Sequence, residues 1–376
     1  MKGLILNPHL LAVPLYIAGK SAEEVQEALG LDGALKLASN ENPHGPSPKA
    51  IAALQAGLQE AHRYPGIAGR EMRLKLAGHH GSGLTPEHFI IGNGATDVLR
   101  MIAQAFIFDG GGSVAGKVSF PLYSLLTTTF GGETISVDAC QDLSFDLQAM
   151  ARACSPQTHI VWLCSPNNPT GLVLRKQEAQ AFVKQLPEHT LAVLDESYSD
   201  YVTDEASVES LDYVRQGLNV IVVRSFSKTA GLANLRVGYG VARPDLIEYL
   251  QHTVLPFNTG ALVIRAACAS LDDHEYHRRC RDLVLSERIF LNDRLLELGF
   301  RCPPSQANFV LVPGVPGGGQ AFAEQLLLHG VIVRPMGPFG LPGAIRVSVG
   351  RHEDSQRFLG AFSGLLASGG PAEIKE

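Results

Sequence analysis

The stretch His159-Ile-Val-Trp-Leu-Cys-Ser-Pro-Asn-Asn-Pro-Thr-Gly171 joins a short apolar run to a loop rich in proline and asparagine. A short apolar run that ends at such turn residues is typical of a buried strand. Similar runs recur along the chain, and segments with helical spacing separate most of them. A further helix is expected ahead of these runs, from about Pro48 to His62. The expected strands are residues 89–91, 113–119, 134–137, 159–164, 191–194, 220–224 and 237–241. Buried strands that alternate with helices predict an α/β fold with a mainly parallel sheet.

The C-terminal part of the chain has a different pattern. After about Phe257, a long charged helix is expected at 274–298, followed by helices and short strands in mixed order, one of these strands at 331–334. This pattern is typical of a smaller α+β domain. We therefore predict an N-terminal arm that is also part of the small domain at residues 1–40, a large domain at 41–258 and the small C-terminal domain at 259–376.

Composition and charge exclude several classes of protein. The chain has 376 residues and a net charge of −6, and it contains no basic run, so a nucleic-acid-binding protein is not expected. It has no apolar stretch long enough to cross a membrane and no pattern typical of a signal peptide. Its six cysteines are scattered and form no C-x-x-C pair, which argues against a zinc site and favours a reducing, cytoplasmic location.

Chemically distinctive residues follow five of the expected strands. In an open parallel sheet, ligands bind beyond the carboxyl ends of the strands. The segments at these ends are Gly92-Asn-Gly-Ala-Thr96, Phe120-Pro-Leu-Tyr123, Ser165-Pro-Asn-Asn-Pro-Thr-Gly171, Asp195-Glu-Ser-Tyr198 and Ser225-Phe-Ser-Lys228. Together they supply an anion site, an aromatic face, an amide, a carboxylate and an amine at one edge of the sheet.

The order of these segments resembles that of the fold-type I pyridoxal 5'-phosphate (PLP) aminotransferases, and within them the histidinol-phosphate aminotransferase family. Further matching segments extend the resemblance nearly from end to end. They are Tyr16-Ile-Ala-Gly-Lys20, Leu37-Ala-Ser-Asn-Glu-Asn-Pro43, Arg63-Tyr-Pro65, Ser225–Arg236, Pro256-Phe-Asn258 and Ile345-Arg-Val-Ser-Val-Gly350. The resemblance implies a large PLP-binding domain with a mainly parallel sheet, a smaller α+β domain, and PLP as the cofactor.

The resemblance assigns the catalytic roles to three residues. Lys228 would form the Schiff base with PLP and then act as general base at the substrate Cα. Asp195 would pair with the protonated pyridine nitrogen, and Tyr198 would donate to the ring phenolate oxygen together with Asn168. Tyr123 would stack on the pyridine ring.

The remaining cofactor contacts would hold the phosphate group. The backbone N–H groups of Ala95 and Thr96, at the start of a helix, and the Thr96 hydroxyl are suited to bind an anion. Ser225, Ser227 and Arg236 would complete this site, and arginine suits it because its donors form a bidentate fork.

The predicted substrates are small amino acids or amino phosphates and keto acids. By resemblance, Arg346 would hold the α-carboxylate or its equivalent, and Arg334 would be the second substrate arginine. Tyr16 and Asn168 would also contact the substrate. Tyr64 would reach the cofactor of a partner subunit, which implies a homodimer.

Several readings of the activity stay open at this point. Histidinol phosphate is the first choice of substrate, and an aromatic or specialised amino acid is the second. A lyase similar to threonine-phosphate decarboxylase would share the same cofactor site. A non-catalytic or dinucleotide-binding protein is disfavoured, because Gly92-Asn-Gly94 is not followed by the third glycine of G-x-G-x-x-G.

The sequence departs from the family pattern at a few positions. Ser197 stands where alanine is usual, Asp200 replaces glutamate, and Asn234 replaces glycine. The stretch around Thr253 lacks an arginine that many relatives carry before Pro-Phe-Asn. These departures leave the cofactor chemistry unchanged and make the side-chain specificity an open question.

Overall fold

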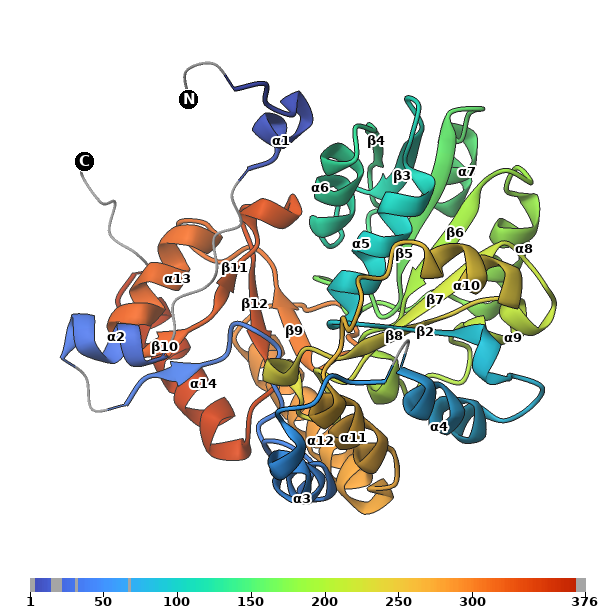
Figure 1. Ribbon diagram of the computed structural model, residues 1–376. Helices are drawn as coiled ribbons and strands as arrows, with labels where there is room; N and C mark the ends of the chain where they lie inside the picture. The colour runs from blue at the N-terminus through green and yellow to red at the C-terminus, as the bar shows by residue number, and fades with distance from the viewer. Residues whose placement is uncertain (1–3, 15–21, 31–32, 67–68, 370–376) are drawn as a thin grey trace.

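A seven-stranded sheet forms the centre of the large domain in the computed structural model, which describes residues 4–14, 22–30, 33–66 and 69–369 (Figure 1). Its strand order is β2-β8-β7-β6-β5-β3-β4. The strands from β7 to β4 run parallel, whereas β8 is antiparallel to both β7 and β2. The bounds are β2 (Phe89–Gly92), β3 (Gly112–Gly116), β4 (Thr134–Val137), β5 (Thr158–Cys164), β6 (Leu191–Asp195), β7 (Val220–Ser225) and β8 (Gly238–Val241). The predicted α/β class with a mainly parallel sheet is confirmed.

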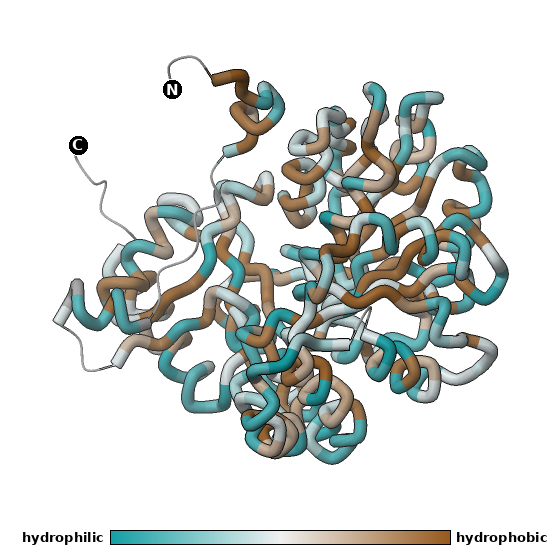
Figure 2. Tube along the Cα trace, in the orientation of Figure 1, coloured by the Kyte–Doolittle hydropathy of each residue, from teal (hydrophilic) through white to brown (hydrophobic). Residues whose placement is uncertain are grey.

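Helices cover both faces of this sheet, so its central strands are apolar on both sides. In β7, Val220 and Val222 join one buried cluster, whereas Ile221 and Val223 join the cluster on the opposite face. Apolar residues accordingly lie along the central strands (Figure 2). The first face carries α3 (Pro48–Gly57), α4 (Arg70–His80), α7 (Leu147–Ala153), α8 (Lys176–Gln185), α9 (Ser210–Arg215) and α11 (Ala261–Leu271). The second carries α5 (Ala95–Phe106), α6 (Leu122–Thr129) and α10 (Pro244–Gln251).

The C-terminal part builds a second, smaller sheet. Its antiparallel strands are β11 (Arg334–Pro335), β12 (Ile345–Ser348) and β9 (Phe309–Val312), in that order. They share a core with α12 (His274–Glu297), α13 (Gly319–Leu328) and α14 (His352–Ala367).

The N-terminal segment joins this second region. β1 (Leu35–Lys36) pairs in parallel with β10 (Val331–Ile332), and Leu37 is buried in the same core. α2 (Ala22–Leu29) lies beside it, whereas α1 (Pro8–Ala12) lies near α6 (Figure 1). These contacts agree with an arm that completes the small domain, and the proposed boundaries at 40 and 258 stay a prediction.

Several elements differ in detail from the sequence prediction. The helix expected at 48–62 ends at Gly57 and continues only as a 3-10 turn, and β3 ends at Gly116 rather than at residue 119. The expected strand at 331–334 is divided between β10 and β11, because its two halves pair with different strands. The 3-10 turns are Leu58–Glu60, Pro86–His88, Ser199–Tyr201, Ala233–Leu235 and Gly337–Phe339. Among the described helices, none has the length and apolar character needed to span a membrane.

Candidate active site

Lys228 lies just after β7, at the edge where the parallel strands end. Its Nζ donates to the carbonyl oxygen of Ser39 at 3.3 Å and lies 5.5 Å from the centre of the Tyr198 ring. Burial lowers the pKa of Lys228 to about 8, and the positive charge of Arg346 acts in the same direction. A much larger fraction of this amine than of an ordinary lysine side chain is therefore neutral near physiological pH, and the neutral form is the nucleophile.

Asp195 ends β6 and is 4% exposed. Its Oδ1 accepts hydrogen bonds from the Ser197 backbone N–H at 3.1 Å and from the Ser197 hydroxyl at 2.6 Å, and its Oδ2 accepts from the Tyr123 hydroxyl at 2.9 Å. Burial raises the pKa of Asp195, and the hydrogen bonds from Ser197 and Tyr123 oppose that rise. No ion pair joins Asp195 to a cation in the described part of the chain. A buried carboxylate of this kind is suited to receive a cationic ligand group.

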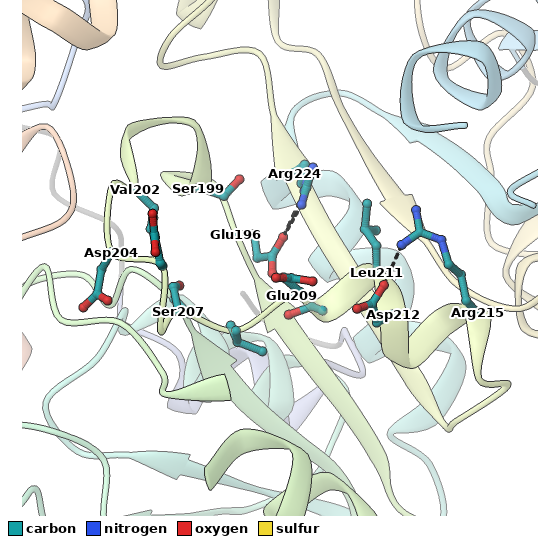
Figure 3. A pocket seen from close by; sticks show the side chains of 14 residues that line it. Glu196, Ser199, Val202, Asp204, Ser207, Glu209, Leu211, Asp212, Arg215 and Arg224 are labelled. Atoms are coloured by element: carbon teal, nitrogen blue, oxygen red, sulfur yellow. Dashed lines mark hydrogen bonds and ion pairs between the residues drawn. The ribbon is translucent and has the colours of Figure 1, made fainter. Parts of the chain in front are cut away.

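The neighbouring carboxylate of Glu196 has a different environment. Its Oε2 accepts from Nε and Nη2 of Arg224 at 2.9 and 2.7 Å. This pair lies in a pocket between β6 and α9, lined by further charged residues such as Asp212 and Arg215 (Figure 3). The pocket contains none of the predicted site residues. Of the two adjacent carboxylates, only Asp195 therefore belongs to the candidate site.

A chain of polar contacts joins the two sheets across the site. Nη1 of Arg346 donates to Oδ1 of Asn168 at 2.5 Å, and its Nη2 donates to the carbonyl oxygen of Ala38 at 2.9 Å. The side-chain amide of Asn40 donates to the Tyr198 hydroxyl oxygen at 3.1 Å. Among the described residues, no acceptor binds the Asn168 side-chain amide N–H groups or the Tyr198 O–H proton, so both can donate to a ligand. Burial raises the pKa of Tyr198 to about 12, so this hydroxyl keeps its proton at neutral pH.

The start of α5 presents unused backbone donors. Within the described residues, the N–H groups of Ala95 and Thr96 have no hydrogen-bond acceptor, as is usual for the first turn of a helix. Gly94 has φ +82°, and a Cβ at this position would clash with Nη2 of Arg236. The Arg236 guanidinium can pack against the backbone at the start of α5 because residue 94 is glycine and has no Cβ. This arrangement is suited to binding an anion.

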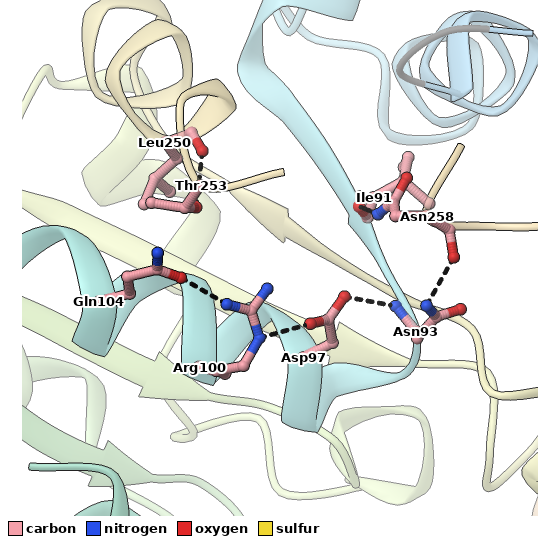
Figure 4. A network of polar contacts seen from close by, with 8 residues as sticks. All are labelled: Ile91, Asn93, Asp97, Arg100, Gln104, Leu250, Thr253 and Asn258. Atoms are coloured by element: carbon pink, nitrogen blue, oxygen red, sulfur yellow. Dashed lines mark hydrogen bonds and ion pairs between the residues drawn. The ribbon is translucent and has the colours of Figure 1, made fainter. Parts of the chain in front are cut away.

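A polar network fixes the segment that leads into α5 (Figure 4). The Asn93 N–H donates to Oδ2 of Asp97 at 2.9 Å, and the Asn93 amide donates to the Asn258 carbonyl oxygen at 2.5 Å. The Asn258 amide in turn donates to the Ile91 carbonyl oxygen at 3.0 Å. At the other side of the same view, the Thr253 hydroxyl donates to the Leu250 carbonyl oxygen at 2.8 Å, in the turn that follows α10.

Ser225 ends β7, and Ser227 lies in the turn that follows it and carries the lysine. The Ser227 N–H donates to the Ser225 hydroxyl oxygen at 3.0 Å, which holds the turn in shape. β8 returns beside this turn, and a Cβ at Gly238 would clash with the Ala95 nitrogen. The serine turn, Arg236 and the start of α5 are thereby brought together at one end of the sheet.

Arg334 and Arg346 face each other on neighbouring strands. They are paired residues in the antiparallel register of β11 and β12, so both side chains lie on the same face of the small sheet. Arg346 is 5% exposed and packs over the Phe309 and Phe339 rings. Arg334 is half-buried and, among the residues that the structure describes, its side chain has no hydrogen bond or ion pair.

The aromatic residues of the prediction lie in three different environments. Tyr123 is buried and stacks on Trp162, with ring centres 5.4 Å apart. Tyr64 is 82% exposed and stacks on Phe257 at 4.7 Å, so it projects from the surface of the subunit. Tyr16 lies outside the described residues.

Two residues with clear structural roles had received no role from the sequence. Asn40 orients Tyr198 and also binds Ser348, with its backbone at φ 55°. Ser197 donates two hydrogen bonds to Asp195, one from its hydroxyl and one from its backbone N–H. The signal for Asn40 was its place in the Ser39-Asn-Glu-Asn-Pro43 segment, because asparagine tolerates positive φ where most residues do not.

Comparison with known proteins agrees with this geometry. The family model "Aminotransferase class I and II" matches residues 32–362. This chain belongs to the class I and II aminotransferases. It is a PLP-dependent enzyme with the fold-type I architecture.

Its relatives place this aminotransferase in the histidinol-phosphate aminotransferase family. It is 41% identical to histidinol-phosphate aminotransferase 1 of Nitrosococcus oceani, over 93% of this chain and 94% of the relative. It is also 41% identical to the histidinol-phosphate aminotransferase of Moorella thermoacetica, over 95% and 92%. The crystal structure of the Sinorhizobium meliloti enzyme in complex with pyridoxal-5'-phosphate superimposes with a TM-score of 0.87 and 25% identity, covering 96% of this chain and 98% of that one.

Proposed function

We propose that this aminotransferase transfers an amino group between histidinol phosphate and 2-oxoglutarate, as a step in histidine biosynthesis. The observation that carries the proposal is the facing pair of Arg334 and Arg346, of which Arg346 lies close enough to Lys228 to lower its pKa. Like charges on directly opposed residues of a sheet destabilise it. An anionic substrate group between the two guanidinium groups offsets this repulsion, and both proposed substrates are anionic.

The residues at the edge of the large sheet fit each part of PLP. Asp195 offers a buried carboxylate for the pyridine nitrogen, and Asn168 and Tyr198 offer free donors for the phenolate oxygen. The phosphate is assigned to the start of α5 and to the turn of Ser225, Ser227 and Arg236, with Ala95 and Thr96 as backbone donors, and the ring face is assigned to Tyr123. The bound cofactor supplies an electron sink for the carbanion that forms when the Cα–H bond breaks.

Lys228 has two functions in this proposal. Its neutral amine would hold the cofactor at its carbonyl carbon, and once free it would act as the base that accepts the proton leaving the substrate Cα. Its pKa of about 8 suits both steps, because a general base works best near the pH of its surroundings. Arg346 orients the substrate by binding its α-carboxylate, or the group that takes the place of the carboxylate. The hydrogen bond from Arg346 to Asn168 couples substrate binding to the cofactor site.

The active unit is proposed to be a cytoplasmic homodimer. Tyr64 and Phe257 form an exposed aromatic pair, and Leu255 nearby is 67% exposed. Exposed apolar groups of this kind gain stability when a second subunit covers them. Tyr64 is then available to contact the cofactor phosphate of the partner subunit. Tyr16 is assigned to the substrate side of the same site.

Steady-state kinetics with matched substrates tests the substrate assignment. The purified holoenzyme is assayed with 2-oxoglutarate and either histidinol phosphate, histidinol or phenylalanine, and the products are identified by mass spectrometry. We expect kcat/KM for histidinol phosphate to exceed that for histidinol by about 100-fold, since hydrogen bonds to charged groups contribute roughly 1.5–3 kcal/mol each.

Other outcomes point to other members of the fold. A higher kcat/KM for phenylalanine would contradict histidinol phosphate as substrate and favour an aromatic aminotransferase. Release of CO2 from phosphothreonine, included as a further substrate, without formation of a keto product would instead identify a lyase of the threonine-phosphate decarboxylase type.

A further inference from the structure

Ser197 makes two of the hydrogen bonds that hold Asp195, and we propose that it is a positioning residue for the cofactor ring. Its hydroxyl donates to Oδ1 at 2.6 Å and its backbone N–H donates to the same atom at 3.1 Å. Ser197 thereby turns Oδ2 of Asp195 toward the ligand, and its two donors on Oδ1 reduce the negative charge on Oδ2. This inference rests on the proposed pairing of Asp195 with the pyridine nitrogen.

The hydrogen-bond count at Asp195 supports this role. An ionised carboxylate has about four acceptor positions. Ser197 occupies two of them on Oδ1, and the Tyr123 hydroxyl occupies one on Oδ2 at 2.9 Å. One position on Oδ2 is therefore left for a donor from the ligand. The three protein donors fix both the rotation of the carboxylate and the atom that faces the ligand.

The Ser197 hydroxyl makes the carboxylate a weaker base. Burial raises the pKa of Asp195, and the side-chain hydrogen bond from Ser197 is the largest opposing contribution. A residue without a hydroxyl at position 197 would keep only the backbone donor on Oδ1. The carboxylate would then attract the shared proton more strongly and leave the pyridine nitrogen less protonated.

The experiment measures the pyridine nitrogen directly. The holoenzyme is prepared with PLP labelled with 15N in the ring, and the 15N chemical shift is recorded at one pH for the wild type, Ser197→Ala and Ser197→Thr. We expect Ser197→Ala to move the resonance toward the value of unprotonated pyridine and to lower kcat about tenfold, as for the loss of a hydrogen bond to a charged group. Ser197→Thr, which keeps the hydroxyl, should restore both.

Two further variants make the result interpretable. Ser199→Ala removes another hydroxyl from the same segment, whose oxygen has no hydrogen bond to a described residue, and should leave the resonance unchanged. Asp195→Asn should give the unprotonated value. If Asp195→Asn moves the resonance and Ser197→Ala does not, the role of Ser197 is refuted. If Asp195→Asn leaves the resonance in place, the proposed pairing of Asp195 with the ring is itself refuted.

Discussion

Lys228 combines a reactive amine with an environment that disfavours its charged form. Burial lowers its pKa to about 8, and the guanidinium of Arg346 acts in the same direction. We expect the rate constant for capture of PLP by the cofactor-free protein to rise with pH through a midpoint near 8, because only the neutral amine attacks. Stopped-flow absorbance measures this rate, with the reaction of PLP and N-acetyl-lysine as the control for ionisation of PLP itself.

The same measurement on Arg346→Gln tests the second cause of the shift. Removal of the positive charge should move the midpoint to higher pH, because a nearby cation disfavours protonation of the lysine. A midpoint that does not move would show that Arg346 has no electrostatic effect on Lys228.

Arg346 also offers a prediction about substrate binding. Its two Nη atoms bind Asn168 and the Ala38 carbonyl oxygen, which fixes the guanidinium plane. Arg346→Lys keeps the charge and loses the bidentate fork, so KM for both substrates should rise by about 10- to 100-fold. Arg351→Lys, an exposed arginine just beyond β12, is the matched control and should leave KM unchanged. An unaltered KM in Arg346→Lys would make Arg346 a purely structural residue.

The chemical role of an individual residue could be predicted from the sequence where that residue lies in a recognisable motif. Lys228, Asp195, Asn168, Tyr198 and Arg346 lie in such motifs, and the structure brings them to one edge of the sheet. Asn40 and Ser197 act through other residues, so their roles depend on distances that no local pattern encodes.

At the scale of elements, the sequence predicted the sheet well because its strands are apolar on both faces. Short apolar runs of this kind are easily recognised, and β5, β6 and β7 were placed within a residue or two. The division of 331–334 into β10 and β11 could not be predicted, because it depends on which strand lies beside each half. The helix α4 was also missed, since it has a weak apolar stripe and few start signals.

The start of α5 provides a prediction at this scale. Gly94→Ala would place a Cβ against Arg236 and displace its guanidinium from the helix start. We expect the affinity for PLP, measured by titration of the cofactor-free protein, to fall at least about tenfold, since charge-assisted hydrogen bonds to the phosphate are lost.

Gly318→Ala is the matched control for this substitution. Gly318 also precedes a helix, and its φ of 85° and ψ of 162° nearly equal the 82° and 167° of Gly94. A Cβ added at Gly318 would make only an ordinary contact, 3.5 Å from the Pro342 carbonyl oxygen, so this substitution carries the same backbone strain without the contact with Arg236. Both variants should lose about 1–3 kcal/mol of stability. An equal loss of PLP affinity in both variants would mean that strain, and not Arg236, determines the result.

At the scale of the whole molecule, the proposed dimer makes each active site depend on two subunits. Lys228→Ala and Tyr64→Ala should each be strongly impaired alone. In a mixed dimer, the subunit that carries Tyr64→Ala still has Lys228 and would receive Tyr64 from its partner. Unfolding and refolding the two variants together should therefore restore about a quarter of wild-type activity, since half of the dimers are mixed and each has one intact site. No recovery on mixing would place Tyr64 in the site of its own subunit or outside it.

Lys228 is proposed to bind PLP covalently and to act there in amino transfer. Borohydride reduction of the holoenzyme, followed by proteolysis and mass spectrometry of the peptides, locates the bound cofactor directly. We predict a phosphopyridoxyl group on Lys228 alone, absent when histidinol phosphate is added before reduction. A label on another lysine, or no label on any peptide, would contradict the assignment of this site.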